Sequence, residues 1–148
     1  MFVIFALLAF GCGTLLVMQV GANNILSRHL GNPYLPTAAS MVVGLVVTSL
    51  LLAVVHRPWP LAAVARTAPW WTWLAGGVLG TVYLTANVLL APKLGAAALV
   101  GLVVTGQLLF SVLADQYGWL GFEQHPASLW RYVGCALMML GVTLISRF

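Results

Sequence analysis

Five hydrogen-bonding side chains, four carboxamides and one phenol, lie inside long apolar stretches of this chain: Gln19, Asn23, Tyr83, Asn87 and Gln107. Gln19 precedes Asn23 by four residues, and Tyr83 precedes Asn87 by four, so on helices each pair would share one face. A carboxamide offers both hydrogen-bond donors and an acceptor. If the five side chains converge, they could replace the water around a small polar solute. The alternative is hydrogen bonding between helices, at about 0.6 kcal/mol per bond.

Asp115 is the acid nearest to these apolar stretches. It continues a row of Gln107, Ser111 and Asp115 at intervals of four residues. An acid beside Gln116 and Tyr117 is typical of a helix end in the headgroup region of a membrane. The alternative is a site that couples transport to a proton or another ion, since acids within membrane segments often mark ion pathways. The residues alone leave both interpretations open.

Other kinds of chemistry have little support in the sequence. No nucleophile has a base at a plausible spacing, no phosphate-binding motif occurs, and the histidines and Glu123 do not show metal-ligand spacing. We therefore expect no enzyme, no metal and no cofactor. The six Lys and Arg residues are scattered along the chain, so they form no patch that could follow phosphates, and we expect no nucleic-acid partner.

Membrane-spanning helices must position these side chains. Six Lys or Arg and two Asp or Glu in 148 residues leave four charge-free stretches, each more than about 20 residues long, which suffices to cross a bilayer as a helix. A shorter fifth stretch follows. The sequence predicts an all-α, polytopic bundle of five transmembrane helices in a single domain over residues 1–148. The expected helices span about 2–26, 34–55, 70–90, 96–114 and 129–145.

The segments between and within these helices add further expectations. The first apolar run has no preceding basic residue, so we interpret it as a retained helix and not as a signal peptide. Residues 61–69 are consistent with a short segment along the interface, and Ala91–Gly95 predicts a tight turn in an antiparallel hairpin. Gly134 and Gly141, seven residues apart, form a smooth strip of the kind that lets membrane helices approach closely. We expect this strip to carry dimer contacts.

The basic residues give no clear orientation in the membrane. Five spans place the two ends of the chain on opposite sides, with Arg57, Arg66 and Arg131 on one side and Arg28, Lys93 and Arg147 on the other. An excess of Lys and Arg in short loops normally fixes orientation. A tie of three against three predicts that both orientations coexist.

Several short motifs, in this order and spacing, resemble the drug/metabolite transporter superfamily and its YdcZ-like group of five-helix, half-length members. The resemblance covers the whole chain, and its residues are Gln19–Asn23, Arg28–Pro33, Gly76–Gly80, Ala91–Ala96, Gly106 with Gln107, Asp115–Gly118 and Gly134–Gly141. It implies half of an inverted-repeat transporter in the bacterial inner membrane. It also implies an antiparallel homodimer, or a heterodimer with a paired five-helix protein, with the substrate path at the interface between repeats.

The chain is more distantly similar to the small multidrug resistance proteins, and one difference is informative. Those proteins exchange protons for cationic drugs through a membrane-embedded glutamate in their first helix, where this chain has Gln19. Their aromatic lining residues correspond here to aliphatic positions near Leu99 and Leu102. These differences argue against proton-for-cation exchange by the same glutamate-based mechanism.

Residues and resemblance together predict a secondary transporter subunit. It would move a small polar metabolite or drug-like solute across the inner membrane by alternating access, as an antiparallel dual-topology dimer. The alternative is a non-transporting helper or structural membrane subunit that pairs with another five-helix protein.

Overall fold

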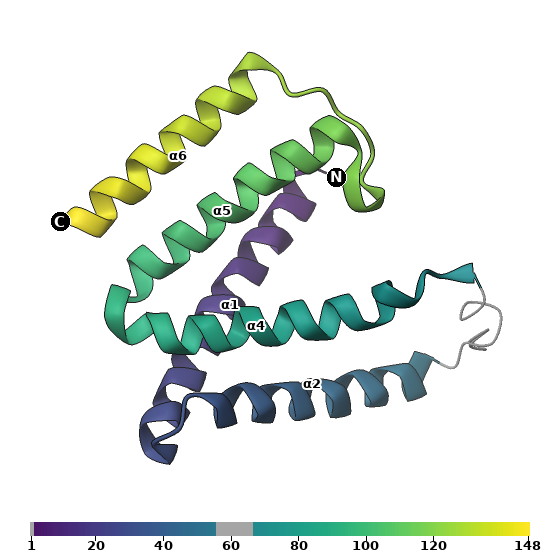
Figure 1. The fold of residues 1–148 in the computed structure, drawn as a ribbon, viewed down its shortest axis with the longest axis vertical. Coiled ribbons are helices and arrows are strands. Elements are labelled where there is room, and N and C mark those ends of the chain that lie inside the picture. The colour runs from purple at the N-terminus through teal and green to yellow at the C-terminus, as the bar shows by residue number, and fades with distance from the viewer. Residues whose placement is uncertain (1, 56–66) are drawn as a thin grey trace. The chain divides into compact units, whose positions relative to one another are not determined.

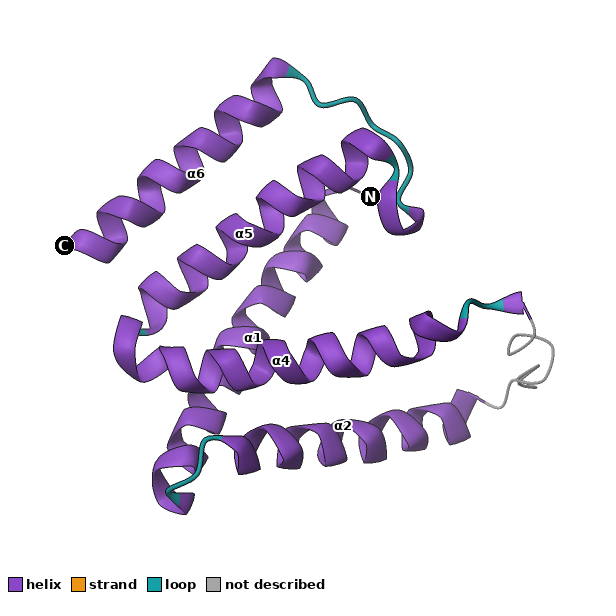
Figure 2. Ribbon diagram, in the orientation of Figure 1, coloured by secondary structure: helices purple, strands orange, loops and turns teal. Residues whose placement is uncertain are grey.

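The computed structural model describes residues 2–55 and 67–148, and all regular secondary structure in these ranges is helical, joined by loops and turns (Figures 1 and 2). Five of the described helices are long and apolar enough to cross a membrane. They are α1 (Phe2–Leu30), α2 (Tyr34–Val55), α4 (Trp70–Leu94), α5 (Ala96–Tyr117) and α6 (Leu129–Arg147), and a short 3-10 helix, η1 (Trp119–Gly121), follows α5. The predicted all-α fold with five spans is confirmed. The expected interfacial segment lies mostly outside the described residues.

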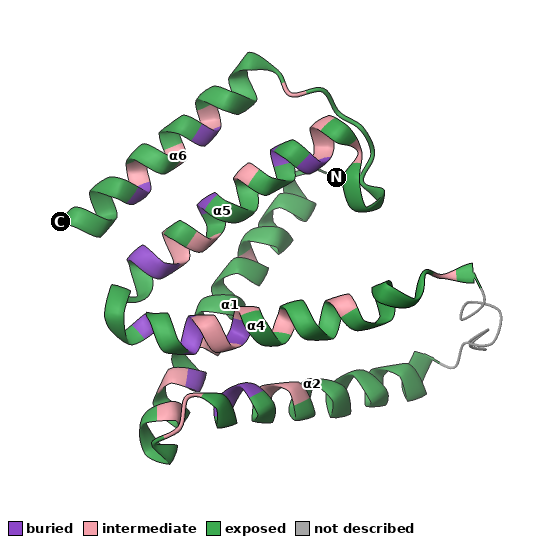
Figure 3. Cartoon of the chain, in the orientation of Figure 1, coloured by how far each residue is buried: buried purple, intermediate pink, exposed green. Residues whose placement is uncertain are grey.

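Most positions on the helices are exposed (Figure 3), and many of them carry large apolar side chains. Phe10, Leu45 and Leu137 are 75%, 68% and 63% exposed. In water such a surface would be an aggregation liability, but in a bilayer it faces lipid tails. The helix is favoured there because it satisfies its backbone N–H and C=O groups within one segment.

The connection between α1 and α2 takes three residues. Gly31 has a positive φ of 62°, which allows the chain to leave α1 without the steric cost that a Cβ would bring. The Asn32 side-chain oxygen then accepts hydrogen bonds from the backbone N–H groups of Tyr34 and Leu35, at 2.8 and 3.4 Å. This cap fixes the start of α2.

The expected tight turn at Ala91–Gly95 is wrong for its first four residues, because α4 continues through Pro92 to Leu94. Pro92 cannot donate to the carbonyl four residues earlier, so it weakens the last turn of α4, but the helix continues for two more residues. Only Gly95, with φ 78° and ψ 159°, separates α4 from α5. The antiparallel hairpin of these two helices stays a prediction.

The described chain divides into two compact units, Met1–Leu90 and Ala91–Phe148. The first unit holds α1, α2 and most of α4, and the second holds the end of α4 with α5, η1 and α6. In the second unit α5 and α6 run antiparallel and side by side (Figure 1). The single domain over residues 1–148 stays a prediction.

At Gly101 the backbone of α5 lies close to a side chain of α6. A Cβ built on Gly101 would lie 2.9 Å from Cγ2 of Val142, and the branched Val142 side chain is buried and has little rotamer freedom in a helix.

We expect Gly101→Ala to destabilise the second unit by about 1–3 kcal/mol, the usual cost of overpacking. Gly106→Ala is the matched control on the same helix, because a Cβ there meets nothing within 4 Å among the described residues. Denaturation in mild detergent, followed by circular dichroism, measures the difference. Equal stability of the two variants would show that α6 moves aside at little cost.

Candidate functional site

Hydrogen bonds between polar side chains join α1 to α2 and α2 to α4 in the first unit. Ser40 Oγ donates to Asn23 Oδ1 at 2.8 Å, and Thr85 Oγ1 donates to Thr37 Oγ1 at 3.3 Å. Thr37 and Ser40 lie three residues apart on α2, about one helical turn, so they share a face. We call these four residues the polar seam.

Asn23 is the least satisfied member of the polar seam. The residue is only 6% exposed, and its Nδ2 has no hydrogen-bond partner among the described residues. An unpaired buried donor costs about 1–3 kcal/mol, so this amide is poised to donate to a solute or to water. Gln19, half-buried, lies four residues earlier on α1 and therefore on the same side.

Tyr83 and Asn87 follow each other on one face of α4. Asn87 is buried, and its Nδ2 donates to the backbone oxygen of Tyr83 at 2.8 Å. This bond within the helix orients the amide. Tyr83 itself is half-buried. The predicted pair therefore combines an oriented amide with a phenol one turn away.

The four predicted site residues of the first unit lie at two heights along their helices. With a rise of about 1.5 Å per residue, Gln19 lies about 14 Å and Asn23 about 8 Å from Arg28 along α1. Tyr83 and Asn87 repeat this order, at about 15 and 9 Å from the lysine in the last turn of α4. Basic residues favour the headgroups, so Gln19 and Tyr83 belong near the middle of a core about 30 Å thick.

In the second unit, an ion pair connects the end of α5 to the start of α6. Arg131 Nη1 lies 3.1 Å from Asp115 Oδ2, and the two side chains are 40% and 30% exposed, respectively. This position at the helix ends agrees with the boundary interpretation of Asp115. Its role in coupling stays a prediction.

The loop from Gly118 to Ser128 is fastened to the end of α5. The backbone N–H of His125 donates to the Asp115 backbone oxygen at 2.8 Å. The Gln116 side-chain oxygen accepts the Ala127 N–H at 2.6 Å, and the Gln116 backbone oxygen accepts from Gln124 Nε2 at 3.1 Å. These bonds hold the loop that delivers Arg131 to Asp115.

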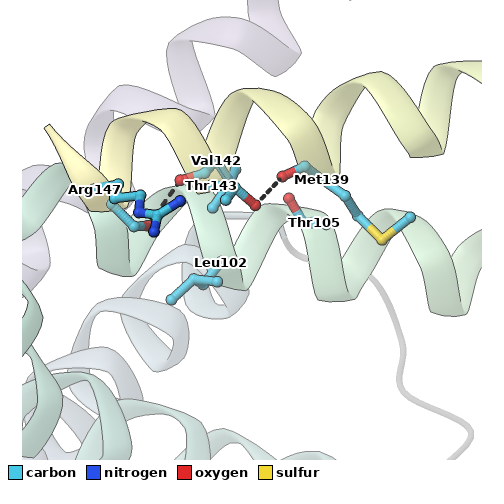
Figure 4. A pocket seen from close by; sticks show the side chains of 7 residues that line it. Leu102, Thr105, Met139, Val142, Thr143 and Arg147 are labelled. Atoms are coloured by element: carbon cyan, nitrogen blue, oxygen red, sulfur yellow. Dashed lines mark hydrogen bonds between the residues drawn. The ribbon is translucent and has the colours of Figure 1, made fainter.

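Two pockets lie along the groove between α5 and α6. The first, about 510 Å³, is apolar with hydroxyls and one cation at its end, and Figure 4 shows its lining: Leu102, Thr105, Met139, Val142, Thr143, Ser146 and Arg147. The hydroxyls of Thr143 and Ser146 donate to the oxygens of Met139 and Val142 (Figure 4). The second, about 340 Å³, is the Asp115 pocket, lined by Leu108, Ser111, Val112, Asp115, Arg131, Gly134 and Cys135.

Comparison with known families adds to this geometry. Residues 4–144 match the family model described as "Putative inner membrane exporter, YdcZ". The chain belongs to the YdcZ family. The resemblance found in the motifs is thereby confirmed, and with it a multi-pass protein of the inner membrane. The YdcZ description is that of exporters and not of enzymes. No curated protein and no solved structure matches the chain.

Gln107 is the one predicted site residue of this YdcZ-family chain that does not belong to the first unit. It belongs to the second unit and is exposed on α5. Two residues earlier, Thr105 is buried and donates to the oxygen of Gly101 at 2.8 Å. The convergence of Gln107 with the residues of α1 and α4 stays a prediction.

The glycine strip of the YdcZ-family chain is not used for packing within the described second unit. A Cβ on Gly134 or Gly141 would meet no described atom within 4 Å. The buried residues of α6 are instead their neighbours Cys135 and Val142. Gly134 also lines the Asp115 pocket, and the dimer contact of the strip stays a prediction.

Sequence reasoning missed Thr37, Thr85 and Arg131 as members of these polar groups. Thr37 and Ser40 share a face at the start of α2, and this spacing was the available signal for the seam. No comparable signal paired Arg131 with Asp115, because 16 residues separate them and the path of the loop decides whether they meet.

Proposed function

We propose that this YdcZ-family chain exports a small polar solute by alternating access, as one half of an antiparallel dual-topology dimer. The observation that carries the proposal is Asn23, a buried amide in a membrane helix whose Nδ2 has no partner among the described residues. A buried polar group without a partner requires an explanation, and binding of a ligand explains the unpaired Nδ2 better than helix packing does. The family description supports the direction of transport.

The chemistry of the amides supports a polar solute without net charge. Gln19, Asn23 and Asn87 donate and accept hydrogen bonds but carry no charge, so they can replace the water shell of such a solute without leaving a counter-charge in the membrane. In the small multidrug resistance proteins, a glutamate that attracts cations lies at the position that corresponds to Gln19. A hydrophobic cation is therefore the less suitable substrate.

A helper or structural subunit is the second candidate, and the polar seam favours it. The bonds Ser40 to Asn23 and Thr85 to Thr37 join neighbouring helices, as purely structural bonds in membrane bundles do. In that case the unpaired Nδ2 of Asn23 would be covered by the partner protein.

An efflux experiment separates the two candidates. Purified protein is reconstituted into liposomes loaded with a water-soluble metabolite extract. Mass spectrometry identifies solutes that leave these liposomes faster than they leave protein-free liposomes loaded with the same extract. We expect one class of polar solute to be released. No release in either direction of an imposed proton or sodium gradient would favour the helper subunit.

The dimer should depend on the glycine strip of α6. We expect Gly141→Leu to convert the dimer into a monomer in mild detergent, because helices in a membrane associate by close packing and a Leu side chain prevents it. The variant should fold, since a Cβ at Gly141 meets no described atom within 4 Å. Light scattering measures the mass.

Leu137→Ala is the control for this prediction, because it changes a side chain that is 63% exposed on the same helix without adding bulk. It should leave the mass unchanged. A dimer that survives Gly141→Leu would place the interface on another helix.

A further inference from the structure

The Asp115 pocket combines two opposite charges with apolar side chains. Asp115 and Arg131, 3.1 Å apart, both line it. Ser111 lies one turn before Asp115, and the buried side chains of Val112 and Cys135 contribute to the lining. From Asp115 to Leu108 the pocket extends along α5 by about 10 Å. Its volume of about 340 Å³ is within the range of small-molecule sites.

We propose that this pocket binds a zwitterion with an apolar body, whose cationic group contacts Asp115 and whose anionic group contacts Arg131. The inference rests on the proposed function, because it names the substrate class that this site admits to the transport path. The apolar body lies against Leu108, Val112 and Cys135. Leu108 is the sequence neighbour of Gln107, a predicted residue of the amide site.

Charge balance selects the zwitterion. When a zwitterion enters, the single ion pair is exchanged for two, and every charge keeps an opposite partner. A simple cation would occupy Asp115 and leave Arg131 unpaired, and a simple anion would do the reverse. Removing one partner of an ion pair is costly at sites shielded from water, and both side chains here are more than half shielded.

The bonds of the loop allow the Asp115–Arg131 ion pair to open without movement of the helix ends. The bonds of His125 to Asp115 and of Ala127 to Gln116 involve backbone N–H groups, so they persist when the Asp115 carboxylate and the Arg131 guanidinium separate. The two charged groups can therefore part to admit a ligand while the helix ends stay in place.

The test measures binding to the purified full-length protein in nanodiscs, by thermal shift and by titration calorimetry. The probes are alanine, leucine and phenylalanine, with 3-methylbutylamine and 4-methylpentanoate as the singly charged analogues of leucine. A ligand bound only by the folded state raises the unfolding temperature. We expect a shift with the zwitterions that have an apolar body, and at least about tenfold weaker binding of both analogues.

Three variants examine the residues. Arg131→Gln and Asp115→Asn should each weaken leucine binding at least about tenfold, whereas Lys93→Gln, which removes a cation from the last turn of α4, should not. Ser111→Phe should block the pocket with the ion pair intact. Leu113→Phe, at an exposed position two residues along α5, is its matched control and should bind normally.

The outcomes distinguish the inference from the proposed function. No shift with any of the three amino acids, equal binding of the singly charged analogues, or normal binding by Ser111→Phe overturns the pocket assignment. Solute efflux in spite of such a result would leave the exporter proposal standing. Binding in the absence of any efflux would instead support the pocket and overturn the exporter.

Discussion

Replacement of Gln19 or Asn87 by leucine should reduce solute efflux about 5- to 150-fold, because a solute group left without its hydrogen bond in a dry site costs about 1–3 kcal/mol. Leucine is similar in volume to these amides but cannot form hydrogen bonds. Both residues lie on membrane helices, one half-buried and one buried. Initial rates from proteoliposomes give the measurement.

The leucine variants should still fold and assemble. The Asn87 side chain donates to the Tyr83 oxygen, which also lies in position to accept the backbone N–H of residue 87 in the helical ladder. Loss of the Asn87 amide therefore does not leave the Tyr83 carbonyl without a hydrogen bond. Assembly of the dimer should not depend on one side-chain hydrogen bond, since hydrogen bonds between membrane helices seldom exceed about 2 kcal/mol.

Thr81→Leu is the matched control on α4. Thr81 is exposed, and its hydroxyl donates to the oxygen of Gly77 in the same helix, so the substitution removes an equivalent bond away from the predicted site. Its efflux should equal that of the wild type. Normal efflux by Gln19→Leu and Asn87→Leu would show that these amides serve packing alone.

The chain should insert in both orientations. A reporter fused to Phe148 should show C-termini on both faces of the inner membrane, because the Lys and Arg residues divide three against three and their imbalance is what fixes topology. The measurement compares a reporter active only in the cytoplasm with one active only in the periplasm.

Added charge should decide the orientation. Glu123→Lys with His125→Lys adds two lysines to one side, and Ser27→Lys with His29→Lys adds two to the other. Each pair should direct most molecules to the orientation with its lysines in the cytoplasm, and the two pairs should act in opposite directions. A wild-type C-terminus found on one side alone would exclude the dual-topology homodimer and favour a paired partner protein.

The sequence predicted the membrane spans well because scarcity of charge and length are both set by the bilayer. It predicted the helix ends less well. α1 continues through Arg28 and His29, since a helix does not have to stop where the hydrocarbon ends. α4 likewise passes Pro92, because one missing N–H in a last turn is not enough to end it.

The polar groups were predictable as a set but not in their pairing. Hydroxyls such as those of Thr81 and Ser49 bond to carbonyls of their own helix, whereas Ser40 bonds across to Asn23, and residue type does not distinguish the two cases. Asp115 and Arg131 meet through a loop whose path depends on Gln116. The position of Gln107 relative to the other amides stays a prediction for the same reason: it depends on packing and not on spacing.

The fastening of residues 118–128 to α5 has a practical consequence for labels. This stretch is mostly exposed, and it would be the usual choice for inserting an epitope or a protease site. Yet an insertion near His125 or Ala127 would pull their N–H groups away from Asp115 and Gln116, and with them the start of α6. Epitopes placed there would report on a distorted protein, and substitution with a small labelled cysteine at an exposed position such as Glu123 is the safer design.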